Sequence, residues 1–499
     1  MPSPLPSRVF HLLFWLLLAP LGARAQQAPA WQWAASPGAG MGFATLIDPA
    51  GDVLVTGSFS GTIRFDTVSL AHSLGSAGFN DVYVAKYSAR GELRWAVRAG
   101  GTDDDSGLAL ALDPQGNIYV AGDFNSPEMA FGDTVLRPVG SYDVFVAKLS
   151  PAGEWVWARR AGGPGHDGVG GLAVDGRGSI YLAGQFQDSA AFGRNRLRSH
   201  GDDDAFVARL DRYGRWQWAR GLGGAYKEVA ADVAADARGH VWLTGAFAGP
   251  TLTVGATTLT NKGQPTTDDL YVAALTHTGE WQWAVRAGGE QNETGCAVAA
   301  DSAGNAYVAG LFTSPAVDFG SIRRANTRDP FLDPTHTADA FVAKLSGAGK
   351  WLWATQAQGD RDERPADLCA DSAGTVRLTG TFESPTLGLG GTTLRREAKR
   401  RGATAGANAS RSAWFAAELS AAGAWQWAVG GPGGTGGLSV GRGGEVALTG
   451  FFPDSVVTLG PVTLNGPDED GGLFIGRLTR EAPMGTGKRR REKSMAAKP

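Results

Sequence analysis

The side chains of this chain that could do chemistry lie in two groups of polar segments within a glycine-rich sequence. Carboxylates beside arginines can recognise a charged glycan or a protein surface. The same residues also fit solvated charges that keep an apolar-rich body soluble. The first group is mostly acidic and comprises Asp103, Asp104, Asp105, His166, Asp167, Tyr226, Lys227, Glu228, Gln291, Asn292, Glu293, Asp360, Arg361, Asp362, Glu363 and Arg364. The second group is basic and comprises Arg194, Arg196, Arg198, Arg323, Arg324, Arg328, Arg395, Arg396, Lys399, Arg400 and Arg401.

Metal chemistry has little support in the acidic group. Asp103, Asp104 and Asp105 are adjacent carboxylates, so a Ca²⁺ ion there is a possible hypothesis. However, Ca²⁺ takes six to eight oxygen ligands, and a calcium loop needs alternating acidic residues and a distal Glu. The D-x-x-G-N segments at Asp113 and Asp301 lack that pattern and fit structural turns better. No other cofactor is predicted.

Catalytic motifs are absent from the sequence. The chain has seven His residues and no H-E-x-x-H, G-x-S-x-G or cysteine-histidine signature. We therefore interpret the chain as a non-catalytic binding scaffold. The alternatives are a structural cell-envelope protein without a specific ligand and, with less support, a hydrolase or quinoprotein-like enzyme.

A repeat must position these groups. The motif W-x-W-A, or its Leu variant, contains most of the 16 Trp residues and begins at Trp31, Leu93, Trp155, Trp216, Trp281, Trp351 and Trp425. A second motif of the Y-V-x-G type ends at Gly57, Gly122, Gly184, Gly245, Gly310, Gly380 and Gly450. Both motifs occur seven times, and units that cannot bury their faces alone must stack into one body.

Each unit reads as four antiparallel strands, A to D. In one stretch, C is residues 144–149, D is 154–158, A is 170–175 and B is 180–186. Turns such as D-P-Q-G-N at Asp113 join A to B. Alternation with period two places Trp155 and Trp157 on one face of strand D, packed against a neighbouring sheet. The acidic group falls in the D–A connections and the basic group in the B–C connections, and these two loop sets should share one face.

Seven such units predict an all-β fold, a seven-bladed β-propeller. The chain begins with a lone D strand at residues 31–34, and its last unit has no D strand after strand C at 474–478. An N-terminal outer strand would therefore close the ring and pair both exposed edges. An open solenoid is the alternative. We predict that residues 26–480 form the propeller.

The strings DAFVAKLSGAGKWLWA from Asp339 and AVAADSAGNAYVAG from Ala297 resemble the bacterial seven-bladed β-propeller repeat called SBBP. The resemblance implies an exported or envelope-associated propeller and supplies no catalytic residues. This chain departs from that repeat in its W-x-W-A motif. It also adds an F-x(5-8)-[FLV]-G element after strand B, as at residues 186–193.

The ends of the chain predict export. Residues 1–25 read as a signal peptide with cleavage between Ala25 and Gln26, so we expect a secreted, periplasmic or cell-envelope protein. The mature chain has no candidate transmembrane segment, and residues 481–499 form a basic tail that we expect to be disordered. A net charge of −3 argues against a nucleic-acid partner. We expect a monomer with free thiols at Cys296 and Cys369, whose registers in equivalent strands differ.

Overall fold

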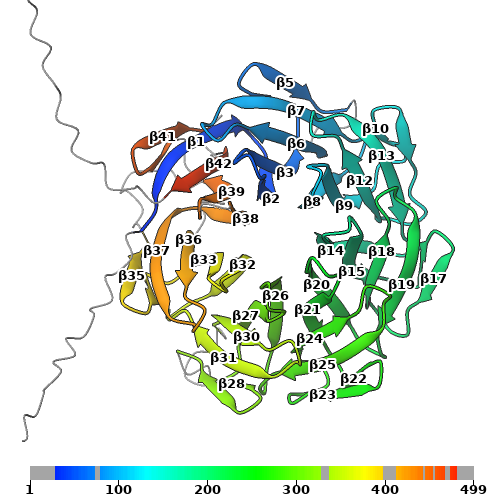
Figure 1. The fold of residues 1–499 in the computed structure, drawn as a ribbon, viewed down its shortest axis with the longest axis vertical. Helices are drawn as coiled ribbons and strands as arrows, with labels where there is room; N and C mark the ends of the chain where they lie inside the picture. The colour runs from blue at the N-terminus through cyan, green and yellow to red at the C-terminus, as the bar shows by residue number, and fades with distance from the viewer. Residues whose placement is uncertain are drawn as a thin grey trace, which may run out of the picture.

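The computed structural model describes residues 28–73, 79–327, 337–396, 412–441, 444–452, 456–466 and 472–479. These residues form seven four-stranded antiparallel sheets set around a central axis, as Figure 1 shows. The predicted seven-bladed β-propeller is therefore confirmed. The predicted signal peptide with its Ala25–Gln26 cleavage site, the tail 481–499, and Arg328, Lys399, Arg400 and Arg401 lie outside the described residues.

The four strand positions of a blade run from the central axis outward. The A strands are β2 (Met41–Ile47), β8 (Asp105–Leu112), β14 (Asp167–Val174), β20 (Glu228–Ala235), β26 (Glu293–Ala300), β32 (Glu363–Ala370) and β38 (Gly434–Val440). The B strands are β3 (Val53–Phe59), β9 (Ile118–Phe124), β15 (Ile180–Phe186), β21 (Val241–Phe247), β27 (Ala306–Phe312), β33 (Val376–Phe382) and β39 (Val446–Phe452). The C strands are β6 (Asp81–Tyr87), β12 (Asp143–Leu149), β18 (Asp204–Leu210), β24 (Asp269–Leu275), β30 (Asp339–Leu345), β36 (Ala413–Leu419) and β42 (Gly472–Thr479). The D strands are β7 (Leu93–Ala99), β13 (Trp155–Ala161), β19 (Trp216–Leu222), β25 (Trp281–Ala287), β31 (Trp351–Gln356), β37 (Trp425–Pro432) and, in the seventh blade, β1 (Ala30–Gly38).

The ring is closed by its first strand, as the sequence predicted. Strand β1 pairs antiparallel with β42, with Trp31 opposite Leu478 and Ala34 opposite Gly476. The seventh sheet therefore contains the beginning and the end of the described chain (Figure 1). This closure covers the outer edge of β42, which would otherwise present unpaired backbone groups.

A bulge in the D strands corrects the expected direction of the tryptophans. The register shifts between Lys148 and Leu149, so Val156 is an extra residue between Trp155 and Trp157. The two rings therefore point to opposite faces of the blade, and not to one face as alternation predicted. Trp155 packs in the cluster between the first and second blades, and Trp157 packs in the cluster between the second and third.

A second bulge, in each A strand, explains the glycine that ends the Y-V-x-G motif. In β14 the register shifts between Val169 and Gly171. A Cβ atom on Gly184, in the paired strand β15, would lie 1.9 Å from the carbonyl oxygen of Gly168. Only glycine lets the two backbones approach this closely.

The F-x(5-8)-[FLV]-G elements form small hairpins on the outside of the ring (Figure 1). They are β4 (Thr62–Phe65) with β5 (Val68–Ala71), β10 (Met129–Phe131) with β11 (Thr134–Leu136), β16 (Ser189–Phe192) with β17 (Asn195–Arg198), β22 (Thr251–Val254) with β23 (Thr257–Thr260), β28 (Ala316–Phe319) with β29 (Ile322–Ala325), β34 (Thr386–Leu389) with β35 (Thr392–Arg395), and β40 (Val456–Leu459) with β41 (Val462–Asn465). Each hairpin covers its own D strand. Phe131, for example, meets the Trp155 ring edge-on with centroids 5.1 Å apart.

The A–B turns are structural, as the sequence indicated. Asp113 Oδ1 accepts hydrogen bonds from the backbone N–H groups of Gln115 and Asn117, at 3.0 and 2.9 Å. The following Gly116 has a φ of 82°, which favours glycine. Cys296 and Cys369 are free and half-buried in β26 and β32. Within the described ranges there is no helix long and apolar enough to cross a membrane.

Candidate binding face at the blade junctions

The D–A and B–C connections share one face of the ring, as predicted; we call it the loop face. Neighbouring blades meet there through backbone hydrogen bonds. The Asp105 N–H, at the start of β8, donates to Asn80 O, just before β6 of the preceding blade, at 2.8 Å. Glu228, Glu293 and Glu363 donate in the same way to Asp203, Asp268 and Ala338. The loop face is thus tied to the rigid scaffold at several blade junctions.

One set of predicted site residues makes side-chain contacts between neighbouring blades, and we call these contacts latches. Asp104 Oδ1 accepts hydrogen bonds from the backbone and side-chain nitrogens of Asn80, at 3.1 and 3.0 Å. His166 packs edge-on against Tyr142 with ring centroids 5.1 Å apart. The other latches join Lys227 to Asp203 at 3.7 Å, Asn292 to the Asp268 N–H at 3.1 Å, and Asp362 to the Ala338 N–H at 3.2 Å. These residues are partly or fully exposed and stay candidates for partner contact.

A second set lies inside the protein and requires a correction. The side chains of Asp105, Asp167, Glu228 and Glu293 are at most 1% exposed, and so is the equivalent Glu363. Each begins an A strand and turns inward below the loop face. The structure therefore does not present these carboxyl groups to a partner. Instead, four of them accept the N–H of a linker glycine, and Glu363 accepts the Ser384 hydroxyl.

Four of these five acids follow a linker with a glycine pair that the sequence interpretation did not use, and the linker before Glu363 is Gln358-Gly359. The Gly101 N–H donates to Asp105 Oδ2 at 2.8 Å, and the Gly163 N–H donates to Asp167 Oδ2 at 2.6 Å. A Cβ atom on the preceding Gly100 would lie 2.2 Å from Asp81 Oδ1. The motif [AL]-G-G-x-x-x-[DE], which precedes four of the five acids, was the available signal when read together with the Asp that begins strand C.

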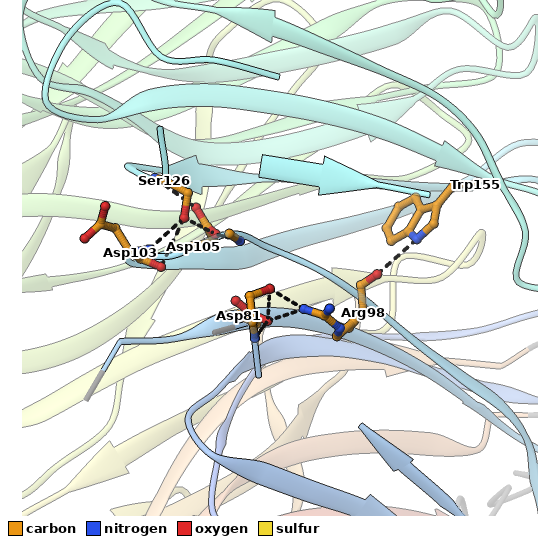
Figure 2. Close-up of polar contacts among 8 residues, drawn as sticks. Asp81, Arg98, Asp103, Asp105, Ser126 and Trp155 are labelled. Atoms are coloured by element: carbon orange, nitrogen blue, oxygen red, sulfur yellow. Dashed lines mark hydrogen bonds and ion pairs between the residues drawn. The ribbon is translucent and has the colours of Figure 1, made fainter. Parts of the chain in front are cut away.

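Serine side chains complete several of these acid sites. Ser126, fully buried at the end of β9, donates its hydroxyl to Asp105 Oδ2 at 2.8 Å and accepts the Asp103 N–H at 2.9 Å (Figure 2). Ser314 and Ser384 occupy the equivalent places beside Glu293 and Glu363. The serine thus links the exposed loop to the buried acid.

Burial dominates the electrostatics of the A-strand acids. Loss of hydration raises the pKa of Asp105 and that of Asp167 to about 7, although the hydrogen bonds that these carboxyl groups accept lower the pKa. The same cause raises the pKa of Glu228 and that of Glu293 to about 8, and that of Glu363 to about 9. A second carboxyl group adds to each shift, namely Asp81, Asp143, Asp204, Asp269 and Asp339 in junction order.

The hypothesis of a Ca²⁺ ion at residues 103–105 is not supported. The Asp104 side chain binds Asn80, the Asp105 side chain binds Gly101 and Ser126, and the Asp103 carboxylate points away from that of Asp105 (Figure 2). The three carboxylates therefore do not converge. Among the residues that the structure describes, no group of three or more His, Cys, Asp or Glu side chains could hold a metal ion.

The predicted basic rim belongs to the outer hairpins at the perimeter of the ring. Arg196 and Arg198 lie in β17, Arg323 and Arg324 in β29, and Arg395 in β35. Arg194 and Arg396 immediately flank such strands. Arg323 pairs with Asp318 at 3.1 Å, and Arg324 donates to Ala354 O at 2.9 Å. The basic residues of the predicted rim that the structure describes thus lie apart from the acidic side chains of the loop face.

The A strands surround a cavity of about 680 Å³ on the central axis. Residues at the A-strand bulges line it, the largest being Phe43, Leu108 and Cys296. Asp232 and Asp367 also line it, and each accepts a backbone N–H of the next blade, from Val298 and Leu438, at 2.8 Å. These two carboxyl groups are therefore clasps between blades. Burial raises the pKa of Asp232 to about 8 and that of Asp367 to about 6.

Comparisons with known proteins support a repeat protein and do not indicate a specific function. No family model matches the chain, so membership of the SBBP family stays a prediction. The chain is 28% identical over 155 residues to an uncharacterized WD repeat-containing protein, L264, of Acanthamoeba polyphaga mimivirus. It is 24% identical over 180 residues to the regulatory protein FlaEY of Caulobacter vibrioides. The matches cover 29% and 35% of this chain but only 11% and 18% of those proteins.

Solved propellers resemble the chain in fold alone. BamB from Moraxella catarrhalis is 11% identical with a TM-score of 0.38, over 91% of this chain and 100% of that one. A gluconolactonase from Xanthomonas campestris is 12% identical with a TM-score of 0.36, over 92% and 99%. A quinohemoprotein alcohol dehydrogenase from Comamonas testosteroni is 8% identical with a TM-score of 0.40, over 91% and 76%. These likenesses do not decide whether the chain is catalytic.

Proposed function

We propose that this chain is a non-catalytic propeller scaffold that binds a protein or glycan partner on its loop face. The observation that carries the proposal is that the blades differ from one another mainly on this face. The latch pairs change from Asn80–Asp104 to Tyr142–His166 and Lys227–Asp203 along the ring. On the opposite face, four-residue turns repeat with the same hydrogen bonds. A surface that differs between blades, on a rigid frame, can select one partner.

The charge of the loop face favours a partner with basic or hydrogen-bond-donating groups. Exposed and half-exposed acids surround the channel mouth, namely Asp103, Asp104, Asp202, Asp203, Asp268, Glu290, Asp360 and Asp362. The basic groups nearby are fewer, namely Lys227, Lys262, Arg361 and Arg364. An acidic surface attracts cationic groups and is screened by salt, with a Debye length of about 8 Å at physiological ionic strength.

Capture with charge variants tests the proposal. Immobilised protein would be incubated with cell-envelope extract and soluble glycans, and the triple variant Asp103→Asn/Asp202→Asn/Glu290→Gln would be compared with the wild type. We expect the variant to lose most of a salt-sensitive partner without a change in melting temperature, because exposed charges contribute little to folding.

A matched control removes the same charge from the opposite face. Glu92, Glu154 and Glu280 are exposed in C–D turns, and the variant Glu92→Gln/Glu154→Gln/Glu280→Gln should keep the partner. Loss of the partner in this control, with retention in the loop-face variant, would place the site on the turns.

We further propose that the scaffold works outside the cytoplasm after removal of residues 1–25. The support is the apolar segment before the Ala23-Arg24-Ala25 site. Intact-mass analysis of exported protein should find Gln26 at its N-terminus, and an exported form that begins at Met1 would contradict the proposal.

A further inference from the structure

At five blade junctions, two buried carboxyl groups belong to the same junction. One acid begins an A strand, and the other begins the C strand of the preceding blade. The pairs are Asp81 with Asp105, Asp143 with Asp167, Asp204 with Glu228, Asp269 with Glu293, and Asp339 with Glu363. All ten side chains are at most 2% exposed. The two junctions of the seventh blade differ, because Ala413 and Gly434 stand at one and Gly472 and Met41 at the other.

In the first four pairs both acids lie against a Gly-Gly linker between the blades, whereas the fifth linker is Gln358-Gly359. A Cβ atom on Gly162 would lie 2.5 Å from Asp167 Oδ2 and 2.8 Å from Asp143 Oδ1. The glycine therefore gives both carboxyl groups access to the same small space. Two ionised carboxylates in such a space repel each other strongly and have lost their hydration.

Hydrogen bonds satisfy only part of these groups. Asp81 Oδ2 accepts from Ser73 and Arg98, at 2.8 and 2.7 Å, but Asp81 Oδ1 is buried without a hydrogen-bond partner. The other buried oxygens without a partner are Asp167 Oδ1, Glu228 Oε1, Asp269 Oδ1, Asp339 Oδ1 and Glu363 Oε2. Every one of the five pairs therefore contains at least one unsatisfied carboxyl oxygen, and such oxygens are costly to bury.

A proton fits these pairs better than a metal ion. The oxygens that do have partners take them from N–H and O–H donors, including the Gly101 N–H and the Ser126 hydroxyl. An arginine already neutralises one carboxylate in three pairs, namely Arg98 at Asp81, Arg160 at Asp143 and Arg286 at Asp269. Two carboxyl groups beside an arginine offer a divalent cation few ligands and little charge.

We propose that each of the five acid pairs holds one shared proton in the folded ring up to about neutral pH, and that these protons make the blade junctions a pH-sensitive lock. The protonated A-strand acid donates its O–H to the carboxylate of the C-strand acid. When the proton leaves to water, two buried carboxylates face each other and the junction weakens.

The sign of the pH effect follows from where the protons are bound. In the unfolded chain these acids titrate near their ordinary values of about 4. In the folded ring the pKa values of the A-strand acids are raised to about 7 to 9, so these acids keep their protons to a correspondingly higher pH. The folded state thus binds more protons than the unfolded state between pH 4 and 9, so stability falls as pH rises through this window.

Other charged groups also face the pairs. Asp104, Asp105 and Asp123 all face Tyr142, and Asp123 and Asp188 face Asp167. His200 contacts Asp204, Asp268 faces Glu228, and Lys262 donates to Asp269. Gln356 donates to Asp339, while Asp360 and Asp362 face Glu363. The neighbours of the A-strand acids are mainly acidic, which strengthens proton retention. Arg160 acts oppositely, because its positive charge lowers the pKa of Asp167.

The test is thermal unfolding of the full chain from pH 5 to pH 9.5. The wild type should lose several degrees of melting temperature toward the alkaline end. The variant Asp105→Asn/Asp167→Asn/Glu228→Gln/Glu293→Gln/Glu363→Gln replaces each shared proton with an amide donor, so its curve should be flatter and cross that of the wild type. The exposed control Asp202→Asn/Glu290→Gln should keep the slope of the wild type. A variant as steep as the wild type would overturn the proposal.

Infrared spectroscopy of the wild type serves as a test even if the fivefold variant fails to fold. The carbonyl band of protonated carboxylic acids should be present at pH 7 and lost as the pH is raised to 9.5. Absence of that band at pH 7 would overturn the proposal of a shared proton. A melting temperature that falls when a chelator removes bound divalent cations would also overturn it.

Discussion

Replacing the half-buried Trp31 with Ala should destabilise the ring by up to about 3 kcal/mol, the lower end of the usual effect of truncating a large buried aromatic side chain. Trp31 meets Trp414 of the sixth blade edge-on, with centroids 5.8 Å apart, and Phe474 of the seventh at 6.2 Å. Two residues on, Trp33 packs on Tyr87 of the first blade and donates its indole N–H to Ala89 O at 3.2 Å. One strand thus joins three blades, so removal of residues 26–38 should have a still larger effect.

Circular dichroism during thermal unfolding measures both changes. Val156→Ala is a matched control, because Val156 is the exposed bulge residue between two tryptophans of the second blade. We expect the control to melt as the wild type does. A truncated protein that melts normally as a monomer would show that β1 does not close the ring.

Gly184→Ala should be among the most disruptive conservative substitutions in a blade interior. The new methyl group would lie 1.9 Å from Gly168 O and 3.0 Å from the Phe206 ring, and the backbone of β14 cannot retreat without breaking its register with β15. Forced overpacking typically costs about 1 to 3 kcal/mol, and the contact with backbone places this change at or above the upper end.

Gly391→Ala provides the control for Gly184→Ala. A Cβ atom at Gly391 would have no heavy atom within 4 Å, apart from the neighbours in the chain, and its φ is not in the left-handed region. Urea unfolding should therefore give nearly equal midpoints for this variant and the wild type. Equal midpoints for Gly184→Ala as well would mean that the A-strand bulge is not as the structure shows it.

The repeat made the fold predictable. The turns and strands follow from motifs that recur along the chain. The turns recur with the same hydrogen bonds, as at Asp113 and Asp301. The one incorrect direction, that of Trp155 and Trp157, came from a bulge at Val156. A bulge inverts the alternation of every residue beyond it, and no residue type at position 156 announces it.

The candidate site was less predictable, because adjacent residues in one loop have different environments. Asp103, Asp104 and Asp105 are alike in the sequence, yet Asp104 latches onto Asn80 while Asp105 is buried beside Asp81. Which of them faces solvent depends on contacts with the preceding blade. A strand start is recognisable in the sequence, but the depth of its first side chain below the loop face is not.

The most direct test of the central claim, that the loop face carries the partner, is hydrogen–deuterium exchange of the protein with and without a captured partner. The partner should slow exchange in residues 101–106, 163–168, 224–229 and 358–364, which belong to the D–A connections. Residues 113–117 and 150–154, in the turns of the opposite face, should exchange equally in both states. Protection of those turns with unchanged D–A connections would contradict the claim.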